Sequence, residues 1–478
     1  MLCGMTADTE VPVDHTLKRE FRLWSSFAFA FAFISPIVAL YGIFGLAIMT
    51  AGPSFWWAFL LVFLGQVLVA LVFGTLVSRW PLEGSIYQWS RRLLGTAYGW
   101  FAGWAYMWTL VIAMATVALG AAGFLASVLG LEAGSGQKAL IAAGILLAGT
   151  VLNLIGRQAL KLFMSASIVA EIIGSIGLGT WLLLFHRNND LGVLVRGFDS
   201  PGYLSLSGPF LVAVAFVGWS FVGFESAGSI AEEVHEPRRN LPKAVIFSLT
   251  FIAIVVMYSS LAIILAIPDV NAVTSGQVAD PVSDTLTTQL GAGIAKPVET
   301  LFVIGFLASF LALQTSASRV IWAYARDNAL PGAARLSRLS SGQKVPTVAL
   351  ALTTVIGAAL FLLSNLANDV YLLMVNFTVG GFFIAFLFPL FGNVVTRVRG
   401  TWQPGPFDTG RAGTVLGLIA LVWAAFEFLN ISWPRPVNTV RWLDWSVWIG
   451  LGVLAAFGSA IYLGLRGKIV AASVDDIR

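Results

Sequence analysis

The sequence contains few of the residues that build disulfide scaffolds and metal sites. Among its 478 residues there is one cysteine, Cys3, and there are three histidines, His15, His186 and His235. A single cysteine can form neither an intrachain disulfide nor a cysteine metal cluster. The histidines fall in the N-terminal tail or in connecting loops, far apart along the chain. We therefore expect no metal site and no cofactor.

Charged residues are also scarce. They make up 11% of the chain, against about 25% in soluble domains. Hydrophobic residues make up 58% and the mean hydropathy is +0.85, which excludes an ordinary soluble enzyme. The 28 Lys and Arg residues are spread over short connections, so no patch for nucleic acid is formed. The apolar segments lack the clustered catalytic groups of a membrane enzyme and the repeated filter loops of a channel.

Long apolar runs dominate the chain instead. A membrane-spanning helix needs about 20 apolar residues. Twelve runs reach or approach this length, near 24–49, 54–77, 98–129, 138–156, 162–185, 209–231, 244–267, 297–324, 346–364, 369–392, 412–431 and 445–465. The polar connections between them are too short to build a core of their own. We therefore predict an all-α integral membrane protein with about 12 transmembrane helices.

The distribution of Lys and Arg predicts the orientation in the membrane. If the N-terminus is placed in the cytosol, 22 basic residues fall in cytosolic segments and six fall outside. Such a bias is typical of cytosolic loops. Residues 1–20 contain no apolar segment of the kind found in cleaved signal peptides. We expect a multi-pass protein of the cytoplasmic membrane with both termini in the cytosol.

Two of the runs carry helix breakers near their middle. In the first run, Pro36 removes a backbone hydrogen bond and pushes Ser35 out of helical geometry. The sixth run carries Gly218 and Gly223 and also an acid, Glu225. A simple kink or a helix-packing glycine would explain either feature alone. Breaks at corresponding places five spans apart favour a transporter built from two inverted five-helix repeats.

Three motifs resemble those of amino acid permeases of the amino acid–polyamine–organocation (APC) superfamily. The sixth run contains GFESA (Gly223–Ala227), followed by an acidic loop with two prolines. The segment RWPLEGSIYQW (Arg79–Trp89) resembles the loop P-x-x-G-G-x-Y-x-W, with Ser85 at the second glycine. The segment RVIWAYARDNALPG (Arg319–Gly332) resembles the loop R-x-x-x-A-x-A-R-D-x-x-L-P. The similarity covers about residues 20–465.

One departure from the family pattern points to a branch of the superfamily. Many members have a Gly-Ser-Gly type of break in helix 1, where this chain has Ser35-Pro36-Ile37. The departure resembles the bacterial and fungal amino acid/choline/GABA branch. It also leaves open how an amino acid would lie against helix 1.

The resemblance implies a LeuT-type fold of five plus five helices with helices 1 and 6 broken. Residues 1–22 would form a cytosolic tail. Residues 23–205 and 206–395 would form the two inverted repeats. Residues 396–478 would form helices 11 and 12 and a short cytosolic C-terminal tail.

The two breaks predict a substrate site. A broken helix exposes unpaired N–H groups on one half and unpaired carbonyl groups on the other, which is costly in hydrocarbon. An α-amino acid can pair with both, through its carboxylate and its ammonium group. We assign Ser35, Ile37, Val38 and Ala39 to the carboxylate side. We assign Phe216, Gly218, Trp219 and Val222 to the ammonium and side-chain side. Trp219 is expected to act as a lid, with packing as the alternative.

Two acids in the apolar runs are predicted to couple transport to protons or to gate the cavity. Glu225 matches the glutamate of the GFESA motif, and a carboxylate alone in an apolar environment tends to take up a proton. A structural tie between helix 6 and a neighbour is the alternative. Glu171 lies in the fifth run, where proton-coupled relatives carry an ionisable residue beside helix 1. Sodium coupling stays open, because Thr315, Ser316 and Ser318 could supply hydroxyl oxygens.

These features predict a secondary active transporter that moves an amino acid by alternating access, with proton coupling. A bundle of helices 1, 2, 6 and 7 would rock to expose the site to each side in turn. A choline, GABA or polyamine carrier is the alternative within transport, and a non-transporting substrate sensor is the alternative outside it. The expected partners are a small-molecule substrate and the lipid bilayer, and the protein could be a monomer or a homodimer.

Overall fold

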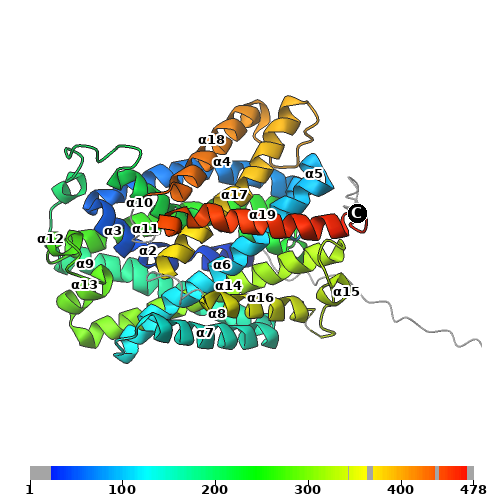
Figure 1. The fold of residues 1–478 in the computed structure, drawn as a ribbon. Helices are drawn as coiled ribbons and strands as arrows, with labels where there is room; N and C mark the ends of the chain where they lie inside the picture. The colour runs from blue at the N-terminus through cyan, green and yellow to red at the C-terminus, as the bar shows by residue number, and fades with distance from the viewer. Residues whose placement is uncertain (1–22, 343, 363–369, 436–440, 471–478) are drawn as a thin grey trace, which may run out of the picture.

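A computed structural model of the protein describes residues 23–342, 344–362, 370–435 and 441–470. The regular structure in these residues is helical, and the long helices run roughly side by side (Figure 1). The fold is therefore all-α, as predicted.

Within the described residues, eleven helical segments are long and apolar enough to cross a membrane. A twelfth apolar helix, α16, is shorter, because it covers Thr347–Leu360 only. The end of the run predicted at 346–364 lies outside the described residues. The eleven segments are Ser26–Ala51, Pro53–Arg79, Thr96–Leu129, Ser135–Ile155, Leu162–Phe185, Pro209–Glu233, Pro237–Ala266, Ala292–Arg326, Val370–Val398, Gly410–Ser432 and Arg441–Leu465.

Burial separates the central spans from the peripheral ones. In the spans Ser26–Ala51 and Pro209–Glu233, 89% of the most apolar window is buried inside the protein, against 11% in Arg441–Leu465. An apolar helix with a small buried share presents its side chains to lipid. The two spans with predicted breakers therefore form the centre of the molecule, and α19 (Ser446–Leu465) lies at its edge.

The first span is broken where Pro36 predicts. Helix α1 (Leu23–Ile34) ends before Ser35, and α2 (Pro36–Tyr41) begins directly after it. Ser35 has φ 50°, a conformation rare for residues other than glycine. A further short helix, α3 (Phe44–Ala51), completes the span.

The sixth span is broken over a longer stretch. Helix α10 (Pro209–Val217) runs into the 3₁₀ turn η4 (Gly218–Phe221). The chain then becomes extended at Val222 and turns at Gly223, where φ is 102°. It continues as η5 (Phe224–Glu233). The prediction of breaks in the first and sixth spans is confirmed.

The fifth span has an irregularity that was not predicted, although Gly174 and Gly177 lie within it. Helix α8 (Arg157–Glu171) changes into a π-helical turn, η2 (Ile172–Gly177), before α9 (Leu178–Phe185) completes the span. Such π turns are rare and often mark functional sites. This one begins immediately after Glu171.

Spans 3, 8 and 10 pack around the broken helices. They are α6 (Thr96–Leu129), α14 (Ala292–Arg326) and α17 (Val370–Val398). Glycine allows α6 and α14 to approach closely, since a Cβ atom at Gly120 would lie 2.5 Å from the Phe306 ring. The remaining long helices are α4 (Trp56–Arg79), α7 (Ser135–Ile155), α11 (Pro237–Ala266) and α18 (Gly413–Ser432).

Short helices mark the two ends of the bundle. At one end lie α5 (Ile86–Leu94) and α15 (Ala333–Leu336), and at the other lie α12 (Val270–Thr274) and α13 (Pro281–Leu290) (Figure 1). We call the end with α5 and α15 the basic face, because its loops carry most of the Lys and Arg. The other end is the opposite face. The short turns η1 (Pro53–Phe55), η3 (Leu191–Val195), η7 (Gly410–Ala412) and η8 (Arg441–Trp445) complete the described elements.

Candidate functional site

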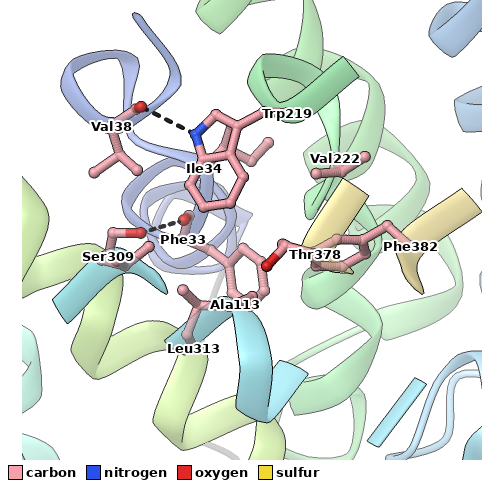
Figure 2. Close-up of a pocket in the computed structure, with 11 residues that line it drawn as sticks. Phe33, Ile34, Val38, Ala113, Trp219, Val222, Ser309, Leu313, Thr378 and Phe382 are labelled. Atoms are coloured by element: carbon pink, nitrogen blue, oxygen red, sulfur yellow. Dashed lines mark hydrogen bonds between the residues drawn. The ribbon is translucent and has the colours of Figure 1, made fainter. Parts of the chain in front are cut away.

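A small cavity lies between the two broken spans (Figure 2). Its volume is about 20 Å³, which is room for about one water molecule. The first span contributes Phe33, Ile34 and Val38, and the sixth contributes Trp219 and Val222. The other walls come from α6, α14 and α17, through Ala113, Val117, Ser309, Leu313, Thr378 and Phe382. The lining is therefore almost wholly aliphatic and aromatic.

Glu171 completes the hydrogen bonding of the first break. Its carboxylate accepts from the Ser35 hydroxyl and from the Ile37 N–H, the latter at 2.9 Å. The Ser35 hydroxyl oxygen also accepts from the Val38 N–H at 3.2 Å. Next to Glu171, the Tyr41 hydroxyl donates to the Gly174 carbonyl at 3.0 Å in the π turn. The fifth span therefore holds the start of α2 through a buried acid.

Side chains of the second break pair with carbonyl groups of the first. The Trp219 indole N–H donates to the Val38 carbonyl at 3.1 Å (Figure 2). The Ser220 hydroxyl donates to the Ala39 carbonyl at 2.5 Å. On the other side of the first break, the Ser309 hydroxyl of α14 donates to the Phe33 carbonyl at 2.7 Å. The two breaks are thus joined directly, across the top of the cavity in Figure 2.

Glu225 completes the second break from within the same span. One carboxylate oxygen accepts from the Gly223 N–H at 3.1 Å, and the other accepts from the Tyr106 hydroxyl of α6 at 3.0 Å. Glu225 is fully buried. It therefore caps the turn and ties the sixth span to the third span, α6.

Three of the eight predicted substrate residues, Val38, Trp219 and Val222, line the cavity. Ser35 forms the bond to Glu171, and Ala39 contributes its carbonyl to Ser220. The others point elsewhere or lie behind the wall. Ile37 packs against Gly305 and Gly174, Phe216 lines a separate cavity, and Gly218 faces Val379, Phe383 and Glu427.

Most of the lining residues were not predicted. Phe33 and Ile34 directly precede the break at Ser35, so proximity to Pro36 was an available signal. The residues from α6, α14 and α17 come from runs without a breaker or acid at that depth, and only the packing identifies them. On α14, the hydroxyls considered for sodium have other partners: Thr315 bonds Asn153, Ser316 bonds Ser229, and Ser318 bonds the Thr315 carbonyl.

A third acid at the breaks was also missed. Glu427 lies in α18 and is fully buried, and neither carboxylate oxygen has a hydrogen-bond partner among the described residues. A Cβ atom at Gly218 would lie 3.5 Å from one of these oxygens. Its helix lies outside the ten predicted repeat helices, which is why the sequence argument passed over it.

The two faces of the protein differ in access to this region. On the opposite face, a cavity of about 530 Å³ begins at Tyr41 and Gly42, one turn along α2 from Val38. On the basic face, side chains close the structure. Arg319 pairs with Glu233 at 2.6 Å, Arg326 pairs with Glu232 at 3.1 Å, and Arg91 pairs with Asp327. The 530 Å³ cavity therefore lies on the opposite face, and these ion pairs lie on the basic face.

Comparison with known proteins agrees with this architecture. A family model described as amino acid permease matches residues 21–455. The branched-chain amino acid permease BcaP of Bacillus subtilis is 27% identical over 430 residues, covering 86% of this chain and 87% of the relative. The amino-acid permease BAT1 of Arabidopsis thaliana is 23% identical, with 92% and 91% covered. The methylthioribose transporter of Bacillus subtilis is 26% identical, with 85% and 86% covered. The chain belongs to the amino acid permease family, within the APC superfamily of membrane transporters.

Proposed function

We propose that this protein is a secondary active transporter that carries a neutral, apolar α-amino acid across the cytoplasmic membrane. The observation that carries the proposal is that both helix breaks meet at one cavity, with a buried acid bonded to each break. The cavity has room for about one water molecule, so it would widen to bind a substrate. Central sites at broken helices are the arrangement by which such transporters bind their substrates.

The lining favours an apolar substrate side chain. Among the described residues that line the cavity, Ser309 and Thr378 carry hydroxyl groups and none carries a carboxylate. A polyamine or choline would require an acid or an aromatic cage against its cation, and here the aromatic rings share the lining with Ile34, Val38 and Leu313. The name of the relative BcaP, a branched-chain amino acid permease, agrees with this choice. The methylthioribose transporter keeps a polar, uncharged substrate as the competing hypothesis.

Glu171 supplies a physical basis for proton coupling. Its carboxylate accepts the hydrogen bond from the Ile37 N–H, at the break where the substrate carboxylate is expected to bind. Two carboxylates that share one site favour uptake of a proton by one of them. Binding of an amino acid beside α2 and protonation of Glu171 would therefore support each other, which is the requirement for symport.

Alternating access would then move the bundle of helices 1, 2, 6 and 7 against the rest. With the Lys- and Arg-rich loops placed in the cytosol, the 530 Å³ cavity faces outward and the salt bridges of the basic face form the cytosolic closure. Loss of these bridges on rocking would open the path from the site to the cytosol.

Counterflow in proteoliposomes tests the proposal. Liposomes preloaded with unlabelled amino acids would be offered a labelled panel that includes leucine, valine, GABA, choline, putrescine and methylthioribose. Uptake of an apolar amino acid that is competed by its unlabelled form is the expected result. Correctly folded protein, judged by a single thermal transition, that accumulates none of the amino acids would overturn the proposal.

A further inference from the structure

Three carboxylates and two guanidinium groups meet at the basic-face end of the sixth span, where η5 ends. Glu83 belongs to the loop between α4 and α5, Glu232 and Glu233 end η5, and Arg319 and Arg326 lie in the last turns of α14. The acids come from the elements proposed to rock, and the arginines come from the scaffold. The cluster therefore spans the joint that must separate for the cytosolic side to open.

Each arginine already has a carboxylate partner. The Arg319 Nε donates to Glu233 at 2.6 Å, and both side chains are buried, with 6% and 0% of their surface exposed. The Arg326 Nη1 donates to both Glu232 oxygens at 3.1 Å. Arg326 also lies 4.6 Å from the centre of the Trp322 ring. These two pairs leave the third acid without a cation of its own.

That third acid is Glu83, which is completely buried. Neither of its carboxylate oxygens has a hydrogen-bond partner among the described residues. Its backbone N–H donates to the Glu232 carboxylate at 3.2 Å, which holds the loop against helix 6. Burial, followed by the nearby Glu233 and Glu232 carboxylates, raises the pKa of Glu83 well above its usual range, and the two arginines offset this only in part.

In the part of the chain that the structure describes, no further ion pair supplies a cation to Glu83. A further ion pair close to the cluster joins Arg91 and Asp327. The Asp327 carboxylate also accepts hydrogen bonds from Tyr87 at 2.9 Å and from Gln88 at 3.2 Å. Arg91 and Asp327 balance each other, so among the described residues named here the closure keeps one acid in excess. A buried carboxylate without a partner cation is stable only in its protonated form.

We propose that Glu83 is a proton-binding site of the cytosolic closure, and that a proton bound there holds the closure shut. The location on the cytosolic side rests on the proposed function. The direction of the effect follows from linkage. Opening would admit water to Glu83 and bring its pKa down toward the ordinary value, so the closed state binds the proton more tightly. Raising the cytosolic pH therefore favours opening, and lowering it favours closure.

Solvent access to the cytosolic half of helix 6 tests this without any substrate. Ser226 lies in η5 between the Gly223 break and the cluster, and it is fully buried. In a Cys3→Ser background, which removes the single native cysteine, Ser226→Cys would report access to a membrane-impermeant methanethiosulfonate applied to inside-out vesicles. The labelling rate of the Cys3→Ser, Ser226→Cys variant would be measured at each pH. It would be divided by the rate of the variant that carries Glu83→Gln in addition. The ratio cancels the pH dependence of the thiol itself.

We expect this ratio to rise with pH, by up to about tenfold per pH unit over the range in which Glu83 is protonated in the closed state and ionised in the open one. The control Glu236→Gln changes an exposed acid that follows η5. Its labelling rate should depend on pH in the same way as that of the protein with Glu236 intact. A ratio that is constant with pH would overturn the proposal. So would a control that abolishes the pH dependence equally.

A second variant covers the case in which Glu83→Gln does not fold. Glu232→Gln changes a partly exposed acid and removes one of the carboxylates that raise the pKa of Glu83. The pH at which labelling accelerates should then move downward, whereas an unchanged midpoint would contradict the proposal. Because the readout needs no transported substrate, these results stand apart from the outcome of the counterflow panel.

Discussion

The two helix breaks solve the same problem in different ways. At the first break a single residue, Ser35, leaves helical geometry, and its polar groups are completed by Glu171 from another span. At the second break the chain leaves regular α-helix over residues 218–233, as two 3₁₀ segments on either side of the extended Val222 and the turn at Gly223. There the turn is closed from within, by the Glu225 carboxylate that accepts from the Gly223 N–H.

This difference assigns different tasks to the two breaks. The first break depends on Glu171 of the fifth span, so a change in the protonation of Glu171 alters a contact between the first and fifth spans. The second break keeps its own cap. Its contacts with other spans include the Tyr106 hydroxyl of the third span and the bonds from Trp219 and Ser220 to carbonyl groups of the first break. If the protein works as we propose, the first break would therefore serve coupling and the second would serve hinge movement.

The largest effect is expected from Gly223→Ala, which acts on the hinge. An L-residue at φ 102° is strained, and the added Cβ atom would lie 2.4 Å from the Phe33 ring. The strain alone is worth about 1–2 kcal/mol, and the clash adds to it. We expect the initial rate of counterflow to fall by about tenfold or more. Gly144→Ala is the matched control, because a Cβ atom there meets no atom within 4 Å. Equal losses in both variants would contradict a special role for Gly223.

A smaller effect is expected from Tyr106→Phe, which removes the hydrogen bond between the third span, α6, and Glu225 at the second break. The substitution removes one hydrogen bond to Glu225 and leaves the bond from the Gly223 N–H in place. A loss of about 1 kcal/mol, or about fivefold in kcat/KM, is expected. The control is Tyr98→Phe, which removes a 2.8 Å bond to the Phe388 carbonyl away from the breaks. If Tyr98→Phe reduced transport as much as Tyr106→Phe, the link would have no particular importance.

Local chemistry explains which parts of the fold were predictable. Proline at position 36 and glycine at position 223 act on their own backbone, so the breaks could be placed from the sequence alone. The positions of the long apolar spans follow from composition in the same way. The π turn after Glu171 contains Gly174 and Gly177, but glycines are common in membrane helices, so they did not identify this irregularity from the sequence.

The candidate site was less predictable because its walls come from several spans. Val38, Trp219 and Val222 lie beside breakers, and they were placed in the site from the sequence. The contributions of α6, α14 and α17 depend on which face of a uniformly apolar helix turns inward, and the hydrophobic pattern of such a helix does not specify it. Glu83 and Glu427 were missed as functional candidates because their unpaired state is a property of their surroundings.

Glu171→Gln tests the central claim, that the acid at the first break couples protons to transport. Glutamine can still accept the Ile37 N–H, but it cannot bind and release a proton. The measurement compares substrate counterflow with accumulation driven by a pH gradient at fixed membrane potential, in the same proteoliposomes. We predict that counterflow is retained and that pH-driven accumulation is lost. Accumulation that persists at the level of the unaltered protein would show that the coupling proton is carried elsewhere.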